Sequence, residues 1–182
     1  TSLIDRRRLL LAVGAGGLTL ALPGGLRAQG TGDTFRLGAL NPVTGAGGPY
    51  GPGMQRAILF AVEEVNAAGG AGGRRLQVFA EDSQTKPDAA VLAAKKLIEV
   101  NQVQAILGTW ASGVTLAVMP LTDAANLIEM NTSGAPAIST LDTKDLVWRF
   151  QATNDRFGQA FAEICAKRGF KHLRVRRRGD LL

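Results

Sequence analysis

The segment spanning residues 35–82 constrains the fold of this chain more than any other, because its pattern alternates between strand and helix. A short apolar run at 35–40 predicts a strand, and an open loop rich in Gly and Pro follows it, with Tyr50 near the tip. Apolar residues at helical spacing predict a helix over about 53–67, and a second apolar run predicts a strand at 76–80. This order is a βαβ unit, and in open α/β sheets ligands bind beyond the carboxyl ends of the strands. The loop that carries Tyr50 is therefore predicted to form one wall of a binding cleft.

The remainder of the chain continues the same alternation. Periodicity and turn residues predict further helices at 87–100, 114–125 and 156–168, and further strands at 105–107, 127–130 and 147–150. Pro120 is expected to kink its helix or end it early, and Glu129 interrupts an otherwise apolar strand. Strands that alternate with helices imply a doubly wound parallel sheet, so the predicted fold class is α/β.

The first 28 residues have the layout of an export signal. Three arginines at 6–8 precede an apolar run of 14 residues at 9–22, and small residues lead to a predicted cut after Ala28. The apolar run is shorter than the roughly 18 to 20 residues that a membrane helix needs, although an uncleaved anchor is the alternative. Residues 5–10 also resemble a twin-arginine motif, so both that route and the general secretory route stay open. The predicted location is the periplasm.

The net charge of +6 does not indicate a nucleic-acid partner, because the basic excess lies at the two ends of the chain. Without residues 1–28 the chain has 17 basic and 14 acidic side chains. Without 171–182 as well, it has 12 basic and 13 acidic ones. A nucleic-acid interface needs a basic face spread over a folded surface, which this distribution does not supply.

Catalytic and metal-binding patterns are not found in the sequence. Cys165 and His172 are each the only residue of their type, so neither an internal disulfide, a zinc-ligand spacing nor a Ser-His-Asp arrangement is predicted. The glycines at 45–48 lead to Tyr50 where a dinucleotide fingerprint needs its third Gly. We therefore expect no cofactor, no metal and no enzymatic activity, and Cys165 is expected to serve packing.

Three loops are predicted to meet at one edge of the sheet, since each follows a parallel strand: 44–53, 108–113 and 131–136. Ser112 lies where a helix begins, so its hydroxyl can cap that helix and the free N–H groups there favour an anion. Ser133 offers a second hydroxyl. As alternatives, Ser112 is a plain helix cap, Ser133 a turn residue and Tyr50 a surface ring. Together the three loops predict a site that holds a small polar ligand.

These segments carry a family resemblance in their order and spacing. Its carriers are Gly38-Ala39-Leu40, Thr44-Gly45, Tyr50-Gly51, 61–70 (AVEEVNAAGG), 76–82, 106–113 (ILGTWASG), 131–135, and Arg149 with Gly158. Over about residues 35–170 the chain resembles the first half of an exported solute-binding protein of the leucine/isoleucine/valine-binding type, which serves ABC importers.

The resemblance implies a fold of two doubly wound lobes that close on a ligand by hinge motion, and an inner-membrane ABC permease as partner. It places the first lobe of this type 1 periplasmic binding fold, incomplete, at 33–150 and the start of a second lobe at 151–172. Residues 173–182 depart from the family as a basic tail. The chain is therefore expected to be a truncated fragment of such a protein.

The family's contacts in the first lobe carry over to this sequence residue by residue. The resemblance places Tyr50 beside the ligand's side chain, Ser112 at its α-carboxylate or amine, and the backbone of Ala111 next to Ser112. Trp110 is bulkier than the family often shows, which suits a flat or aromatic ligand.

Two further contacts come from the third loop. Ser133 and Ala135 fall where the family uses one backbone and one hydroxyl contact, and Ala135 lacks the hydroxyl that amino-acid binders often have. Asp155 is a weaker candidate for an amine contact. The expected ligand is a small amino acid, amide or related carboxylate. A ligand-sensing domain of the same fold and an exported α/β enzyme are the alternatives.

Overall fold

A computed structural model describes residues 34–172, so the predicted export signal and the basic tail lie outside the described residues. Five parallel strands form one sheet in the order β2-β1-β3-β4-β5. The strands are β1 (Phe35–Asn41), β2 (Leu76–Asp82), β3 (Ala105–Thr109), β4 (Ile128–Asn131) and β5 (Val147–Arg149). This arrangement confirms the predicted doubly wound α/β class.

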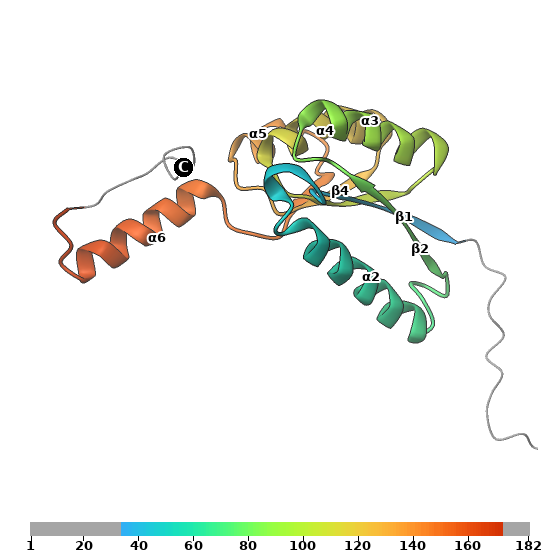
Figure 1. The fold of residues 1–182 in the computed structure, drawn as a ribbon, viewed down its shortest axis with the longest axis horizontal. Coiled ribbons are helices and arrows are strands. Elements are labelled where there is room, and N and C mark those ends of the chain that lie inside the picture. Colours follow the sequence, from blue (N-terminus) through green and yellow to red (C-terminus); the bar gives the residue numbers. More distant parts are fainter. Residues whose placement is uncertain (1–33, 173–182) are drawn as a thin grey trace, which may run out of the picture. The chain divides into compact units, whose positions relative to one another are not determined.

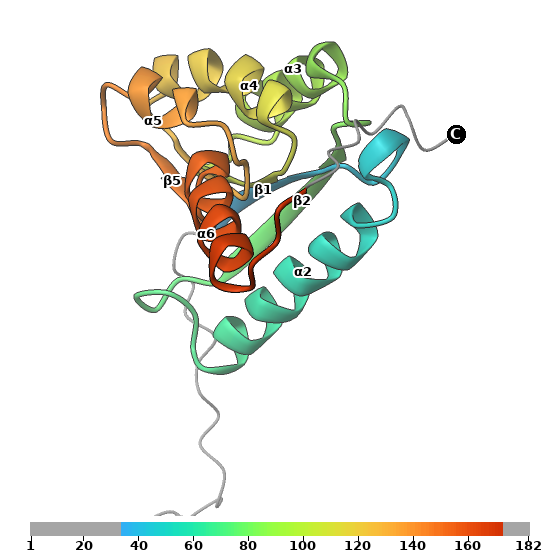
Figure 2. The same cartoon turned by 90° about the vertical axis from the view of Figure 1, so that its left-hand side faces the viewer.

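Helices cover both faces of the sheet. They are α2 (Gly51–Ala67), α3 (Pro87–Lys95), α4 (Ser112–Ala124) and α5 (Ala137–Leu141), with short turns η1 (Gly45–Gly47) and η2 (Lys96–Val100). Helix α6 (Asn154–Lys167) follows β5, and all of its residues except Cys165 are exposed. Helix α2 lies on one face, whereas α3, α4 and α5 lie on the other (Figures 1 and 2). No helix among residues 34–172 is both long and apolar enough to cross a membrane.

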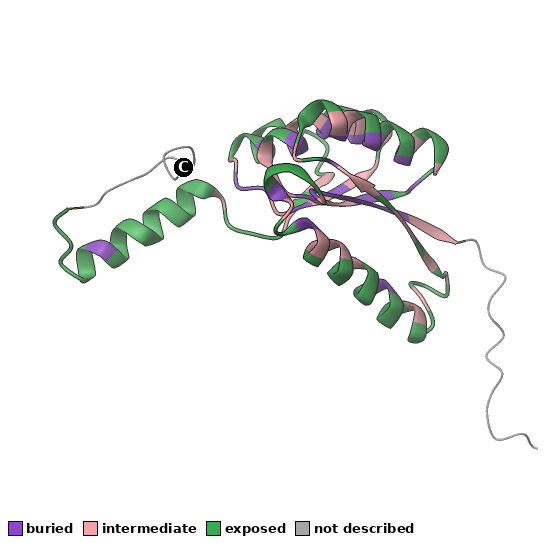
Figure 3. Cartoon of the chain, viewed as in Figure 1, coloured by how far each residue is buried: buried purple, intermediate pink, exposed green. Residues whose placement is uncertain are grey.

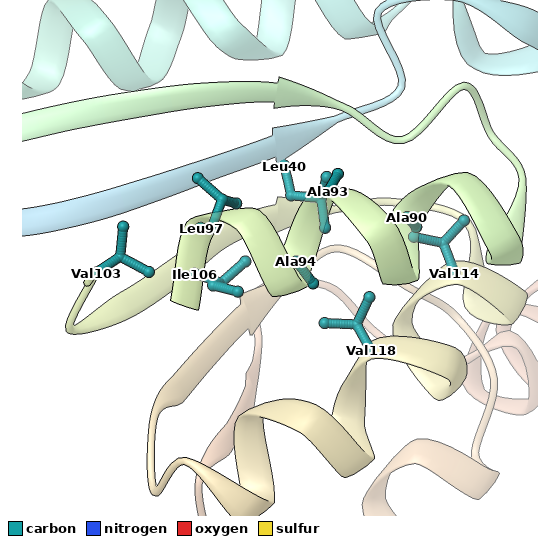
Figure 4. Close-up of a cluster of buried hydrophobic side chains, with 9 residues drawn as sticks. All are labelled: Leu40, Ala90, Ala93, Ala94, Leu97, Val103, Ile106, Val114 and Val118. Carbon is teal, nitrogen blue, oxygen red and sulfur yellow. The ribbon is translucent and has the colours of Figure 1, made fainter. Parts of the chain in front are cut away.

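The face under α3 and α4 buries the larger core, which we call the apolar cluster (Figure 4). Its members are Leu40, Ala90, Ala93, Ala94, Leu97, Val103, Ile106, Val114 and Val118. The small alanines of α3 let this helix approach the sheet closely, and Leu97 fills the space above Gly38, where an added Cβ would lie 3.0 Å from the leucine Cδ1. Burial in Figure 3 is accordingly concentrated in the strands and the inward sides of α3 and α4.

The opposite face has a thinner core. Val62 of α2 packs against Leu37 and Ala105, with partly buried neighbours around them. The end of α2 is held by a side chain as well, since Asn66 Oδ1 accepts from Leu76 N at 2.7 Å and its Nδ2 donates to Leu76 O at 2.9 Å. This two-bond clamp fixes the start of β2 against the helix.

Several element boundaries differ from those predicted. Helix α2 begins at Gly51 rather than 53, and α4 begins at Ser112 rather than 114. Helix α4 continues through Pro120 to Ala124, because Pro120 is exposed and solvent can replace the hydrogen bond that its missing N–H would make. Helix α5 was not predicted, since five residues are too few to show a helical period. Strand β4 is Ile128–Asn131, one residue later at both ends than the predicted 127–130, and it includes Glu129, which is fully buried.

Candidate ligand-binding edge of the sheet

The carboxyl ends of the strands form an edge at which the loops are tied together by hydrogen bonds. Thr44, after β1, binds Asp82 at the end of β2 through its N–H (3.1 Å) and its hydroxyl (2.5 Å). Thr132, after β4, donates from its N–H to Thr109 O at 3.1 Å. Tyr50, in the loop after β1, also contacts Trp110, in the loop after β3, so the predicted meeting of the three loops at this edge is confirmed.

Tyr50 and Trp110 form an aromatic pair at this edge. Their ring centroids are 5.4 Å apart with an interplanar angle of 34°, and Tyr50 is 57% exposed. Tyr50 directly precedes α2, and the following Gly51 is required there because a Cβ at this residue would lie 2.0 Å from Pro42 O. The close approach of Pro42 to Gly51 thus sets where the Tyr50 ring stands.

Ser112 connects two of the loops. It is the first residue of α4, the N-cap is Ala111, and no side chain caps this helix. The Ser112 hydroxyl instead accepts a hydrogen bond from Ala135 N at 3.2 Å. The expectation that Ser112 caps the helix is thus wrong, because the serine lies one residue inside it. The carbonyl of Ala111 is used by the helix start, where it accepts from Val114 N at 2.8 Å and Thr115 N at 3.0 Å.

Ser133 lies behind the edge rather than on it. Its side chain is fully buried and its hydroxyl is 2.6 Å from Thr115 Oγ1 and 3.0 Å from Trp110 O. Its N–H donates to Asn131 Oδ1 at 3.0 Å. In this structure the Ser133 hydroxyl therefore holds the Trp110 loop in place.

Ser133 belongs to a group of buried polar side chains on β3, α4 and β4, which we call the polar cluster. Its members are Thr109, Thr115, Thr122, Glu129, Asn131 and Ser133. Within it, Thr109 Oγ1 donates to Glu129 Oε1 at 2.8 Å, and Thr122 Oγ1 lies 3.1 Å from Glu129 Oε2. The cluster therefore connects the body of the sheet to the loops that carry Trp110 and Ser133.

Arg149 is a residue at this edge that sequence reasoning did not place in the site. It ends β5, pairs with Asn131 in register, and donates from Nη2 to Ala135 O at 2.9 Å. Its Nε is buried without a hydrogen-bond partner among the described residues. The available signal was its place among the residues that carry the family resemblance. Ser112 accepts from the N–H of Ala135 and Arg149 donates to its carbonyl, so both backbone polar groups of Ala135 have partners.

The pKa values of three carboxyl groups, Glu129, Asp82 and Asp155, differ from their ordinary values. Burial raises the pKa of Glu129 to about 7, although hydrogen bonds from Thr109 and Thr122 oppose the shift. Partial burial would raise the pKa of Asp82, but hydrogen bonds led by the Thr44 hydroxyl outweigh it and the net shift is downward. A hydrogen bond from the Thr153 side chain lowers the pKa of Asp155, which is exposed on α6.

Other concave or acidic features lie away from this edge. A cavity of about 270 Å³ is lined by Leu116, Met119, Pro120, Asp123, Leu141, Asp142, Thr143, Leu146 and Val147. Both carboxylates in this lining already have partners. Asp123 forms an ion pair with Lys144, and Asp142 accepts hydrogen bonds from the backbone N–H groups of Leu146 and Val147. Among residues 34–172 no three His, Cys, Asp or Glu side chains gather closely enough to hold a metal ion. The strand edge, with its aromatic pair and small-residue loops, is the better candidate for a ligand.

The sequence model of the family described as periplasmic binding protein matches residues 34–175. The chain belongs to this family. A leucine-, isoleucine-, valine-, threonine- and alanine-binding protein of Pseudomonas aeruginosa is 27% identical to it over 137 residues, which cover 75% of this chain and 36% of the relative. BasB of Halobacterium salinarum, a substrate-binding protein of a chemotactic signal transduction system, is 35% identical over 118 residues, 63% of this chain and 28% of BasB.

A solved structure supports the same assignment for this periplasmic binding protein. The solute-binding protein of an ABC transporter from Rhodopseudomonas palustris, in complex with 3,4-dihydroxybenzoic acid, aligns with a TM-score of 0.69 and 25% identity, over 77% of this chain and 38% of that one. The fold is therefore that of a lobe of a type 1 periplasmic binding protein, and the family consists of binding proteins rather than enzymes. The chain spans between 20% and 36% of the length of the curated relatives compared with it.

Proposed function

We propose that this chain supplies the first ligand-binding lobe of an extracytoplasmic solute-binding protein, which captures a small carboxylate-bearing solute and delivers it to an ABC permease. The proposal is supported by the groups that meet at the carboxyl ends of the strands. The Tyr50–Trp110 pair stands beside the Ser112–Ala135 link, so an apolar surface and polar backbone groups occur at the same strand ends. Ligands of α/β sheets bind at such an edge.

The roles of the residues follow from their exposure and contacts. Tyr50 and Trp110 offer ring faces to the ligand's side chain. The Ser112 hydroxyl accepts from Ala135 N and keeps its own hydrogen to donate to a carboxylate, and Ala111 and Ala135 place backbone with small side chains next to it. Ser133 supports the Trp110 loop from behind, and Arg149 brings positive charge to the same strand ends.

Two ligand classes fit this edge. Amino acids are named for the Pseudomonas relative, and an aromatic acid is bound by the Rhodopseudomonas protein. The Tyr50–Trp110 pair favours the aromatic acid, because offset or tilted rings stabilise each other by about 0.5 to 1.5 kcal/mol beyond area burial. Ala135, which has no hydroxyl for an amine, favours it as well.

The experiment is chemical-shift mapping of the isotope-labelled chain with L-leucine and, separately, 3,4-dihydroxybenzoate. This measurement detects the weak binding expected of one lobe. We expect the amide resonances of Trp110, Ser112 and Ala135 to move with dihydroxybenzoate, and to move less with leucine. Shifts confined to residues around the α4–α5 cavity, or none at millimolar ligand, would contradict the proposal.

A second function is supported by one comparison. BasB serves a chemotactic system, so the same lobe in a sensing protein would bind the ligand but pass it to a receptor. Co-purification of the exported whole protein with either an ABC permease or a chemoreceptor decides between the two. Export itself rests on the predicted signal at 1–28, and mass spectrometry of the exported product is expected to show cleavage after Ala28.

A further inference from the structure

Glu129 occupies an unusual place for a carboxyl group. It lies in β4 between Ile106 of β3 and Val147 of β5, and its side chain is fully buried. The two ion pairs among the described residues involve other carboxylates, Glu81 with Lys96 and Asp123 with Lys144. A buried carboxylate without a cationic partner is costly, and proteins commonly avoid this cost by keeping the group neutral.

The hydrogen-bond geometry around Glu129 requires one more hydrogen than the threonines supply. Thr122 Oγ1 is 3.0 Å from Met119 O and 3.1 Å from Glu129 Oε2. A threonine hydroxyl has one hydrogen and can also accept, whereas a carbonyl and an ionised carboxylate only accept. If the carboxyl carries a proton on Oε2, it donates to Thr122, Thr122 donates to Met119 O, and Thr109 donates to Oε1. Every group then has a partner.

No charged side chain accounts for this arrangement. Arg149 of β5 pairs with Asn131, two residues beyond Glu129, but its guanidinium donates to Ala135 O and contributes nothing to the pKa of Glu129. On α4 the charged residue is Asp123, which pairs with Lys144 from the α5–β5 loop at 3.3 Å. Asp142, at the end of α5, accepts from the N–H groups of Leu146 and Val147. The raised pKa of Glu129 has burial as its main cause, with only the two threonine hydrogen bonds besides, so neutrality follows from the surroundings and not from a neighbouring charge.

We propose that Glu129 is a positioning residue for the ligand edge, and that it acts as a neutral carboxylic acid which takes one proton from solvent and donates it in a hydrogen bond to Thr122. Loss of the proton leaves an ionised carboxylate between the sheet and α4 and makes Thr122 share one hydrogen between two acceptors. Thr109 transmits the change, because it binds Glu129, precedes Trp110, and accepts from Thr132 N. The position of the Trp110 loop at the ligand edge therefore depends on pH.

The effect on ligand capture rests on the proposed function, whereas the proton and the loop position are measured without ligand. Infrared difference spectra of the full chain are expected to show a protonated carboxylic C=O band at pH 6 that is absent from Glu129→Gln and retained in Glu63→Gln, which alters an exposed glutamate of α2. A spectrum in which Glu129→Gln loses no such band would overturn the proposal.

If Glu129→Gln does not fold, the threonine partner gives a second test of the same hydrogen bond. Thr122→Val removes the acceptor of the carboxyl proton, so the C=O band is expected to move to higher frequency. Thr122→Ser keeps the hydroxyl and is expected to leave the band in place. Equal band positions in both variants would overturn the proposed donor.

The fluorescence of Trp110 tests the positioning role of Glu129. In a Trp148→Phe background Trp110 is the only tryptophan of the chain, and its emission is expected to change with a midpoint near the titration of Glu129. The change is expected to vanish in Glu129→Gln and to persist in Glu63→Gln. Emission that is constant with pH in the parent, or that titrates equally in Glu129→Gln, would overturn the positioning role. Absence of ligand-induced shifts with these results intact would contradict only the proposed function.

Discussion

The layer between the sheet and helices α3 and α4 contains two buried regions of different chemistry. The apolar cluster under α3 is built from Ala, Leu, Val and Ile alone, whereas the polar cluster beside α4 buries hydroxyls, an amide and a carboxyl group. Apolar contacts are non-directional, so the first region supplies cohesion without fixing any one atom. Hydrogen bonds have preferred distances and angles, so the second region sets where the loops of the ligand edge lie. The comparison indicates that stability and site geometry depend on different residues.

The largest expected effect is in the apolar cluster. Leu97→Ala leaves a cavity against Gly38 and is expected to lower the free energy of unfolding by about 2 to 5 kcal/mol, equally at pH 5 and pH 8, because no titratable group is involved. Urea denaturation at the two pH values measures this. Leu92→Ala, in helix α3 directly before η2 and 70% exposed, is the matched control and should change stability little.

The next effect is in the polar cluster and depends on pH. The pKa of Glu129 is raised from its ordinary value of 4.5 to about 7 in the folded chain, so the folded state binds the proton more tightly than the unfolded state. Its contribution to stability is therefore fully present below about pH 4.5 and is lost as pH rises to about 7. Between these two pH values the equilibrium constant for unfolding rises about tenfold per pH unit. Glu129→Gln is expected to remove this dependence and to be more stable than the parent above pH 7 by about 3 kcal/mol.

The measurement is urea denaturation from pH 4.5 to pH 8, with Glu63→Gln as control. Parallel pH profiles for the parent and Glu129→Gln would erase the proposed difference between the two regions, since the polar cluster would then respond to pH no more than the apolar one.

A smaller effect is expected where the polar cluster reaches the edge. Ser112→Ala removes the acceptor of Ala135 N and a hydroxyl offered to the ligand, so dissociation constants for a carboxylate are expected to rise about ten- to a hundredfold, for a bond of about 1.5 to 3 kcal/mol. Calorimetry of the whole protein that carries this lobe measures it. Ser139→Ala, on the exposed side of α5, should bind as the parent does.

The smallest effect is expected at the exposed aromatic pair. Tyr50→Ala is expected to lose about 0.5 to 1.5 kcal/mol of binding to an aromatic acid and less to leucine, while Tyr50→Phe keeps the ring and should bind nearly as the parent does. Competition between the two ligands, followed by calorimetry, measures the preference. If Tyr50→Ala abolishes binding while Ser112→Ala does not, the site is chiefly an aromatic clamp.

Much of this architecture was predictable from local pattern. The strands, the alternating long helices and the convergence of three loops follow from periodicity and from parallel pairing, which places all carboxyl ends at one edge. Tyr50, Ser112 and Ala135 were assigned to that edge and lie there, although their part in binding stays a proposal. Helix α5 is too short to give a periodic signal. The continuation of α4 through Pro120 could not be predicted either, because it depends on which side of that helix faces solvent.

The sequence by itself determined the fold class, because hydrophobic period is a local property that tertiary contacts rarely reverse. Tertiary structure alone decided what the polar side chains do. Ser133 is buried behind Trp110, Arg149 reaches the carbonyl of Ala135 from 14 residues away, and Glu129 finds hydroxyls from β3 and α4 instead of a cation. The physical reason is that a hydrogen bond depends on the position of two atoms, and packing brings together atoms that are distant along the chain.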